Sequence, residues 1–225
     1  MLPYELRLPE RPVDGAPLVV LLHGRGSNRH DLIGFHPHLP PGTMLVTPEA
    51  PFPGAPWGYG PGSAWYRFIA EGLPDETTLT ESLVWLDELL RELPSALPVR
   101  PGSLSLGGFS QGGTASVAYA LTRRGTVDRV INLSGFVPRH PDVRVERDTV
   151  SGVRWFWGHG TSDAQIPFRL AEQGRAALRA AGADLTAHDY PMGHGVAPAE
   201  LRDLRDWLTR DAALATDSVG ERNGA

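Results

Sequence analysis

The chain has 225 residues, of which 41% are hydrophobic, and this length and composition fit one domain with a sizeable core. The formal net charge of −5 without a long basic run argues against a nucleic-acid-binding protein, and no apolar run reaches the roughly 18 residues of a transmembrane helix. The absence of cysteine excludes disulfides, cysteine zinc sites and a cysteine nucleophile.

Short apolar runs alternate with segments of helical periodicity along the chain. Strands are expected at residues 18–22, 44–47, 103–106, 130–133, 153–157 and 185–190, and helices near 28–35, 79–93, 111–124, 168–181 and 198–208. A capping box of Thr78 with Glu81 marks the start of the second helix. Residues 48–68, which contain five prolines and six aromatic residues, are expected to form a long irregular loop. The alternation predicts a single α/β domain over residues 1–215, with a mainly parallel sheet and helices on both faces, followed by a flexible tail at 216–225.

A G-x-S-x-G motif runs from Gly108 to Gly112 and places Ser110 between an apolar strand and a helix. This is the setting of a nucleophile elbow, a turn so tight that only glycines fit around the serine. The helix N-terminus beside the serine favours negative charge. The alternative interpretation of the motif alone is an ordinary glycine-rich turn.

A serine nucleophile needs a base, and the base needs a carboxylate to orient it. Asp163 follows the strand at 153–157, and His194 follows the strand at 185–190. Because parallel strands end at the same edge of a sheet, these loops are expected to converge on Ser110. Other acids are less suited, because Asp142 precedes its strand, Asp184 begins one and Asp189 lies within one. Of the other histidines, His188 lies within a strand, and His159 follows the strand whose loop is expected to carry the acid.

The transition state of acyl transfer also needs two N–H donors directed at its oxyanion. The backbone of Gln111, after the serine, is the expected first donor, and the backbone of Arg25 is the expected second. Glycines on both sides of Arg25 let its loop turn back over the serine. His36 and His38 lack a third metal ligand nearby, so no metal site is expected.

These segments resemble the carboxylesterase/phospholipase family of α/β-hydrolases, which includes small bacterial carboxylesterases and acyl-protein thioesterases. The likeness runs from about Leu18 to Leu208 and includes LLHGRGSN, GGFSQGG, GHGTSDAQIP, GHGV and an Ala-Trp-Tyr run at 64–66. The resemblance implies cofactor-free hydrolysis of carboxylic esters, and of thioesters in some members. It maps the triad onto Ser110, Asp163 and His194, and the oxyanion donors onto Arg25 and Gln111. No segment is long enough for a large cap domain, so an open pocket is expected.

Two features bear on the substrate. Many members of the family carry an apolar residue where this chain has Arg25, whose side chain either favours acidic or strongly polar acyl groups or points into solvent. Aromatic and apolar residues in the loops are candidates for the pocket wall, unless they only hold the loops on the core. These are Trp57, Tyr59, Trp65, Tyr66, Phe136 and Ile166.

The predicted function is a serine carboxylesterase acting on small ester substrates, short- to medium-chain or aryl, through an acyl-enzyme. Alternatives are a thioesterase or lysophospholipase-like hydrolase, and a non-catalytic binding protein of the same fold. A dienelactone-hydrolase-like lactonase is disfavoured because that group uses a cysteine nucleophile. The N-terminus lacks the apolar core of a signal peptide, so a cytoplasmic monomer or homodimer is expected, without cofactor, nucleic acid or integral membrane association.

Overall fold

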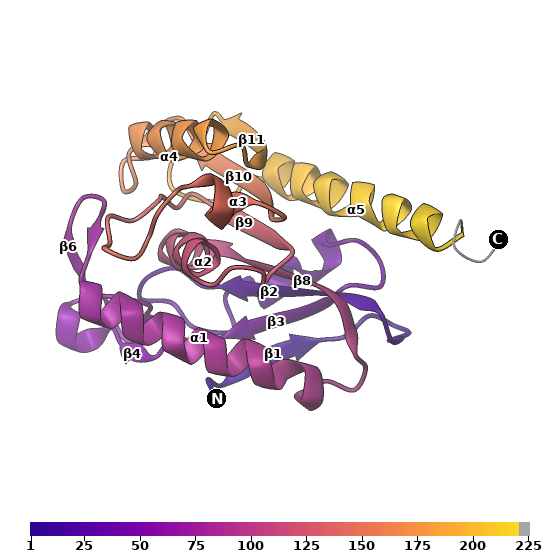
Figure 1. Ribbon diagram of the computed structural model, residues 1–225. Coiled ribbons are helices and arrows are strands. Elements are labelled where there is room, and N and C mark those ends of the chain that lie inside the picture. Colours follow the sequence, from indigo (N-terminus) through magenta and orange to yellow (C-terminus); the bar gives the residue numbers. More distant parts are fainter. Residues whose placement is uncertain (221–225) are drawn as a thin grey trace.

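The computed structural model describes residues 1–220, with side chains described for residues 1–210. Its centre is a seven-stranded sheet (Figure 1). The spatial order is β1 (Tyr4–Arg7), β3 (Met44–Pro48), β2 (Ala16–Leu22), β8 (Pro101–Phe109), β9 (Arg129–Leu133), β10 (Arg154–Gly160) and β11 (Asp184–Tyr190). Only the edge strand β1 is antiparallel to its neighbour in this sheet, and the other neighbours are parallel. The predicted single-domain α/β fold with a mainly parallel sheet is confirmed.

Side chains of the central strands alternate between two hydrophobic cores, as the twofold period of a strand requires. On β2, Leu18, Val20 and Leu22 enter one core, while Val19 and Leu21 enter the other. The first core is covered by α1 (Glu76–Ala96), α2 (Gln111–Thr122), α3 (Arg147–Val150) and α4 (Phe168–Ala180). The second is covered by the 3-10 helix η1 (Leu32–His38) and by α5 (Pro198–Gly220). Helices therefore cover both faces, as the sequence predicts.

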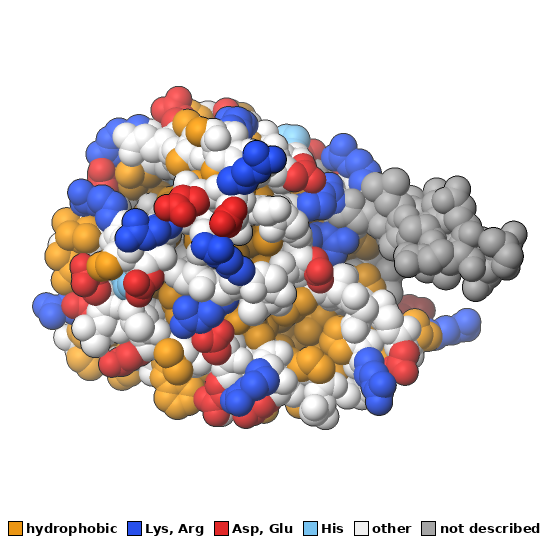
Figure 2. Space-filling model, in the orientation of Figure 1, with side chains coloured by type: hydrophobic (Ala, Val, Ile, Leu, Met, Phe, Trp, Pro, Cys, Tyr) orange, Lys and Arg blue, Asp and Glu red, His pale blue; other side chains and the backbone are white. Residues whose placement is uncertain are grey.

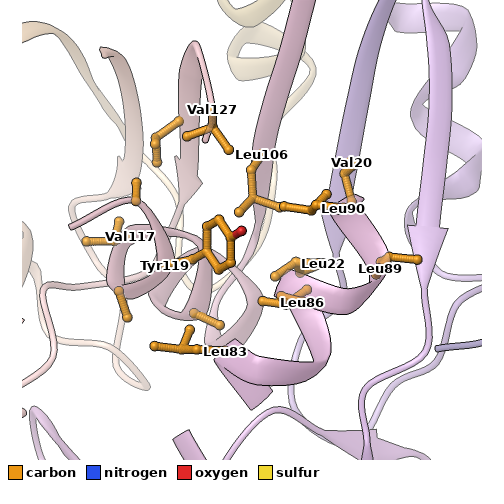
Figure 3. Packing of buried hydrophobic residues seen from close by; sticks show 14 of the residues in the cluster. Val20, Leu22, Leu83, Leu86, Leu89, Leu90, Leu106, Val117, Tyr119 and Val127 are labelled. Atoms are coloured by element: carbon orange, nitrogen blue, oxygen red, sulfur yellow. The ribbon is translucent and has the colours of Figure 1, made fainter. Parts of the chain in front are cut away.

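Helices α1 and α2 pack against β2 and β8 and hold the end of β8 in place. Figure 3 shows Leu83, Leu86 and Leu90 of α1 around Tyr119 of α2, with Leu106 of β8 close to Leu90 and Tyr119. Each such buried leucine stabilises the fold by roughly 1.5–3 kcal/mol. This packing fixes the strand-to-helix junction that carries Ser110.

Helix α1 begins earlier than the sequence pattern indicates. Its N-cap is Asp75, whose side chain accepts a hydrogen bond from the Thr78 backbone N–H at 2.9 Å. Thr78 and Glu81 therefore lie inside the helix, and the predicted capping box is wrong. An aspartate at the N-cap position satisfies a free N–H of the first turn as well as a threonine does.

Residues 48–68 contain short pieces of regular structure where the sequence predicts an irregular loop. The pieces in this region and just beyond it are β4 (Phe52–Pro53), the 3-10 turn η2 (Ala55–Trp57), β5 (Ser63–Ala64), β6 (Phe68–Ala70) and β7 (Leu73–Pro74). β4 pairs with β5, and β6 pairs with β7, both antiparallel. Prolines lack a backbone donor and so keep these ribbons short.

The carboxyl end of the chain continues as α5 to Gly220. The tail predicted for 216–225 thus begins within this helix, and residues 221–225 lie outside the described residues. None of the described helices is long and apolar enough to cross a membrane. On the described part of the face in Figure 2, arginine and acidic side chains are interspersed without a large field of one sign.

Candidate active site

The turn between β8 and α2 lifts Ser110 out of the sheet. Its backbone has φ 56° and ψ −113°, a left-handed conformation that is costly for a residue with a side chain. A Cβ atom at Gly108 would lie 2.3 Å from the Leu22 carbonyl oxygen, and one at Gly112 would lie 2.0 Å from the same atom. Only glycines fit at these two positions, which is the physical reason for the motif.

Three side chains from separate loops meet at this turn. The Nε2 atom of His194 lies 2.8 Å from the Ser110 hydroxyl oxygen, and its Nδ1 atom lies 2.7 Å from Oδ2 of Asp163. A carboxylate can only accept, so Nδ1 carries the proton and donates it to Asp163. Nε2 is then left as the acceptor that faces the serine hydroxyl. The structure brings all three residues expected in the triad within hydrogen-bonding distance in the right order.

The acid is held by its own turn. The Asp163 side chain is fully buried, and its Oδ1 accepts hydrogen bonds from the backbone N–H groups of Gln165 and Ile166, both at 2.9 Å. These bonds hold Oδ1 in place and leave Oδ2 for His194. β10 runs to Gly160, beyond the predicted end at residue 157, so His159 lies within the strand.

His159 supports this turn from below. It is buried, and its Nε2 donates to the Ile166 carbonyl at 2.9 Å while lying 3.6 Å from Oδ2 of Asp163. Burial lowers the pKa of His159, which keeps the ring neutral. His159 therefore positions the loop of Asp163, and within the described residues it has no hydrogen bond to Ser110.

The other acidic candidates are engaged elsewhere or lie in solvent. The carboxylate of Asp189 pairs with Arg175, and that of Asp184 pairs with Arg154 at 3.0 Å. Asp142 is exposed, and its backbone N–H donates to a neighbouring histidine. Of the acids considered, Asp163 has the contact to His194.

The loop that contains Arg25 is fixed from both sides. His23 is buried, donates from Nδ1 to the Gly24 carbonyl at 2.7 Å, and accepts from the Ala50 N–H at Nε2. Burial lowers the pKa of His23, so the neutral ring keeps both bonds. Gly26 has φ +75°, and a Cβ atom there would lie 2.1 Å from the Tyr59 carbonyl oxygen. The loop can take this path only with glycine at position 26.

A cleft of about 500 Å³ opens at Ser110. Arg25, Gln111 and His194 line it beside the serine, so both predicted oxyanion donors border the same space. The remaining wall residues are Gly24, Ser27, Asp31, Tyr66, Phe68, Phe109, Phe136, Gln165 and Ile166. Tyr66, Phe136 and Ile166 are thus where the sequence predicts them. Ser27, Asp31, Phe68, Phe109 and Gln165 were not predicted, because no sequence pattern marks which loop residues face a cleft.

Three aromatic residues expected in the pocket do not line the cleft. Trp65 is fully buried in the core, and its Nε1 donates to the His23 carbonyl at 3.0 Å. Trp57 lies against Phe52 and Tyr59, with ring centroids 5.3 and 5.8 Å apart. Trp57 therefore packs within the ribbon of residues 52–64, and Trp65, which follows this ribbon, binds the loop of Arg25 through the His23 carbonyl.

The side chain of Gln111 has a contact that the sequence does not indicate. Its Oε1 accepts from the Trp65 backbone N–H at 2.8 Å, and its Nε2 donates to the Tyr66 carbonyl at 2.6 Å. Gln111, the residue after Ser110, therefore binds the backbone of the aromatic segment at 65–66, and Tyr66 of this segment lines the cleft. The partners are some 45 residues apart in sequence, which is why spacing could not predict the pair.

A family model described as phospholipase/carboxylesterase matches residues 9–211. The chain belongs to this family. It is thus an enzyme, a hydrolase of carboxylic esters as a class.

Relatives of this hydrolase are named either acyl-protein thioesterases or carboxylesterases. It is 29% identical to acyl-protein thioesterase 1 of Cryptococcus neoformans over 84% of this chain and 90% of the relative. It is 25% identical to carboxylesterase SOBER1 of Arabidopsis thaliana over 60% of each chain. Among solved structures, the Bacillus cereus carboxylesterase superposes with a TM-score of 0.80 at 20% identity, covering 93% of this chain and 94% of that one. The latter likeness establishes the shared α/β-hydrolase fold.

The hydrolase also buries a carboxyl group that takes no part in the triad. Glu200, in the first turn of α5, is fully buried, and a Cβ atom at Gly158 of β10 would lie 1.9 Å from its Oε1. Burial raises the pKa of Glu200 to about 8, opposed in part by the Ala197 N–H and by Arg175. At neutral pH this side chain is mainly a neutral acid.

Stability should therefore fall as the pH rises from about 4.5 to about 8, because the unfolded chain releases this proton before the folded chain does. Glu200→Gln, which cannot ionise, should become more stable relative to wild type across this window, by on the order of a few kcal/mol at pH 8. Urea denaturation at pH 5, 6.5 and 8 measures the difference. The exposed Glu172→Gln is the matched control, and a constant difference for Glu200→Gln at all three pH values would contradict the prediction.

Proposed function

We propose that the protein is a serine carboxylesterase that cleaves short- to medium-chain or aryl esters through an acyl-enzyme. The observation that carries the proposal is the pair of contacts made by His194, 2.8 Å to Ser110 and 2.7 Å to Asp163, beside an open cleft. A lone serine hydroxyl is a weak nucleophile, and this arrangement supplies the base and its orienting carboxylate.

In the first half of the reaction, Nε2 of His194 takes the hydroxyl proton of Ser110 while Oγ attacks the ester carbonyl carbon. The carbonyl oxygen becomes an oxyanion, for which the backbone N–H groups of Arg25 and Gln111 are the proposed donors. Asp163 keeps the imidazole in the required tautomer and stabilises its positive charge. His194 then gives its proton to the leaving alcohol as the bond from carbon to the alcohol oxygen breaks, which leaves the acyl group on Ser110.

In the second half, water replaces the alcohol. His194 takes a proton from the water as its oxygen attacks the acyl carbon, and the same oxyanion donors act again. The proton passes to Oγ of Ser110 as the acyl bond breaks, and the carboxylic acid leaves. Each residue returns to its starting protonation state, so no cofactor is needed.

The size and lining of the cleft favour small or medium-sized substrates. Its volume of about 500 Å³ lies within the range of small-molecule sites, and Tyr66, Phe68, Phe136 and Ile166 give it an apolar wall. Apolar walls of this kind suit acyl chains and aryl groups. The cytoplasmic location and the monomeric or homodimeric state inferred from the sequence stay predictions.

Thioester hydrolysis is the second candidate, because the relative with 29% identity over most of both chains is named an acyl-protein thioesterase. Oxyesters and thioesters pass through analogous tetrahedral intermediates to the same acyl-enzyme, and a Ser-His-Asp triad serves both. Side-by-side rates for S-phenyl thiobutyrate and phenyl butyrate distinguish the two functions.

The test of the main proposal is a series of p-nitrophenyl esters from acetate to palmitate. We expect kcat/KM to be highest for short or medium chains, because the cleft is open and limited in volume. A maximum at palmitate would favour a lipase-like or acyl-protein thioesterase-like enzyme instead. Failure to cleave any ester or thioester in the set would contradict both candidates.

A further inference from the structure

The Arg25 side chain is a cation that lines the cleft and pairs with no carboxylate of the described residues. Among the described residues it makes no recorded ion pair or side-chain hydrogen bond, although it lines the same cleft as Ser110. Its guanidinium carbon lies 4.8 Å from the ring centroid of Tyr59 and 6.0 Å from that of Phe68. Contacts with ring faces leave the N–H groups of a guanidinium free for a ligand.

The backbone that carries Phe68 is tied to Tyr59. The Tyr59 hydroxyl accepts a hydrogen bond from the Phe68 backbone N–H at 2.7 Å. Tyr59 thus supports Arg25 with its ring and fixes the Phe68 wall of the cleft with its hydroxyl. A guanidinium in contact with the Tyr59 ring keeps fewer rotamers than one in open solvent, so less entropy is lost when it binds a ligand.

The backbone beneath Arg25 is equally constrained. The Gly26 N–H donates to the Ser63 carbonyl at 2.9 Å, and the Ser63 N–H donates to the Ser27 carbonyl at 2.7 Å. A Cβ atom at Gly62 would lie 2.2 Å from the Gly26 carbonyl oxygen, which shows how closely the two segments approach. The position of Arg25 is therefore set by a backbone ladder as well as by its side-chain contacts.

The charges at the cleft define what this arginine would select. Within the described residues, Arg25 is the one arginine that lines the cleft and Asp31 the one carboxylate, whose Oδ2 accepts from the Ser27 hydroxyl at 2.8 Å. Of the other titratable groups in the wall, His194 is committed to Ser110 and Asp163, and burial raises the pKa of Tyr66, which keeps its hydroxyl neutral. Asp31 reduces the positive potential but is not paired with Arg25.

We propose that Arg25 recognises an anionic group on the ester, so that the preferred substrates carry a carboxylate or phosphate in their acyl or alcohol part. This inference rests on the proposed ester hydrolysis and names its substrate class. A planar guanidinium binds such groups through two parallel N–H···O contacts, which an apolar residue at this position could not supply. The same residue would then act twice, with its backbone at the oxyanion and its side chain at the anion.

The test compares matched ester pairs that differ by one charge. Mono(4-nitrophenyl) adipate is set against the corresponding adipamide ester for the acyl side, and 4-carboxyphenyl butyrate against 4-carbamoylphenyl butyrate for the alcohol side. The readout is the ratio of kcat/KM for the anionic ester to that for the neutral ester, after subtraction of spontaneous hydrolysis. Arg25→Gln should lower this ratio about tenfold for one of the pairs, which also identifies the half of the ester that Arg25 contacts.

Three further variants control for net charge and geometry. Arg25→Lys should keep part of the preference, Asp31→Asn should raise the ratio severalfold, and Arg91→Gln, an exposed arginine on α1, should leave it unchanged. Added salt should lower the wild-type ratio more than that of Arg25→Gln. Ratios that agree within about twofold between wild type and Arg25→Gln for both pairs, while the neutral esters are hydrolysed, would overturn the inference alone. Failure of wild type on every ester would instead overturn the proposed function, and the inference with it.

Discussion

Ser110→Ala should lower kcat for ester hydrolysis by about 10⁴- to 10⁶-fold, and His194→Ala should lower it by a similar factor. Both changes break the contact of 2.8 Å through which the serine proton is transferred. The double variant should lose no more kcat than either single variant, because Ser110 and His194 act in the same proton transfer. Measurement of kcat with p-nitrophenyl butyrate in the three variants tests this directly.

The fold should survive these substitutions. Alanine keeps the Cβ atom of Ser110, so the elbow retains its backbone at φ 56° and the packing of β8 and α2 is unchanged. Circular dichroism and thermal denaturation check this point. Ser105→Ala, which removes a buried hydroxyl from β8, the strand that precedes Ser110, is the matched control and should keep near wild-type kcat.

A second readout does not depend on turnover. A fluorophosphonate probe should label the wild type at Ser110 and should fail to label Ser110→Ala, since the probe reacts only with an activated serine. Ester hydrolysis near the wild-type rate in pure Ser110→Ala would mean that another nucleophile is responsible. Labelling at a different serine would identify that nucleophile.

Asp163→Asn should lower kcat by about 10⁴-fold while leaving KM nearly unchanged. An asparagine that donates to Nδ1 of His194 would stabilise the tautomer with its proton on Nε2, which faces Ser110 and then cannot accept the serine proton. The expected effect is on chemistry, because the Asp163 side chain is fully buried and away from the substrate.

The controls are the two rival acids. Asp142→Asn changes an exposed carboxylate, and Asp189→Asn breaks the contact with Arg175, so the first should be silent and the second should affect stability more than kcat. The prediction for Asp163 would be contradicted if its variant kept near wild-type kcat. Loss of activity in Asp142→Asn or Asp189→Asn would then move the acid to that position.

The residues of the candidate triad could be predicted because local rules determine them. The glycines around Ser110 follow from steric limits within a few residues, and the loops of Asp163 and His194 follow strands whose apolar pattern is visible in the sequence. Parallel strands end at one edge of the sheet, so the meeting of residues in these loops can be predicted without knowing how the side chains pack. The fold class rests on the same alternation of strands and helices.

Which side chains line the cleft and which support it could not be predicted from the sequence, because it depends on tertiary packing. Trp65 lies in the core, and its backbone binds Gln111 across 46 residues. Tyr59 lies beneath Arg25, and Glu200 is buried against Gly158. Such pairs depend on how distant segments pack, and a loop aromatic or a helical glutamate has no local pattern that marks its partner. The candidate reacting groups and their order along the chain are therefore visible in the sequence, because the strand pattern brings their loops to one edge of the sheet. The wall of the cleft and the surroundings of Arg25 depend on contacts that exist only once the domain has folded.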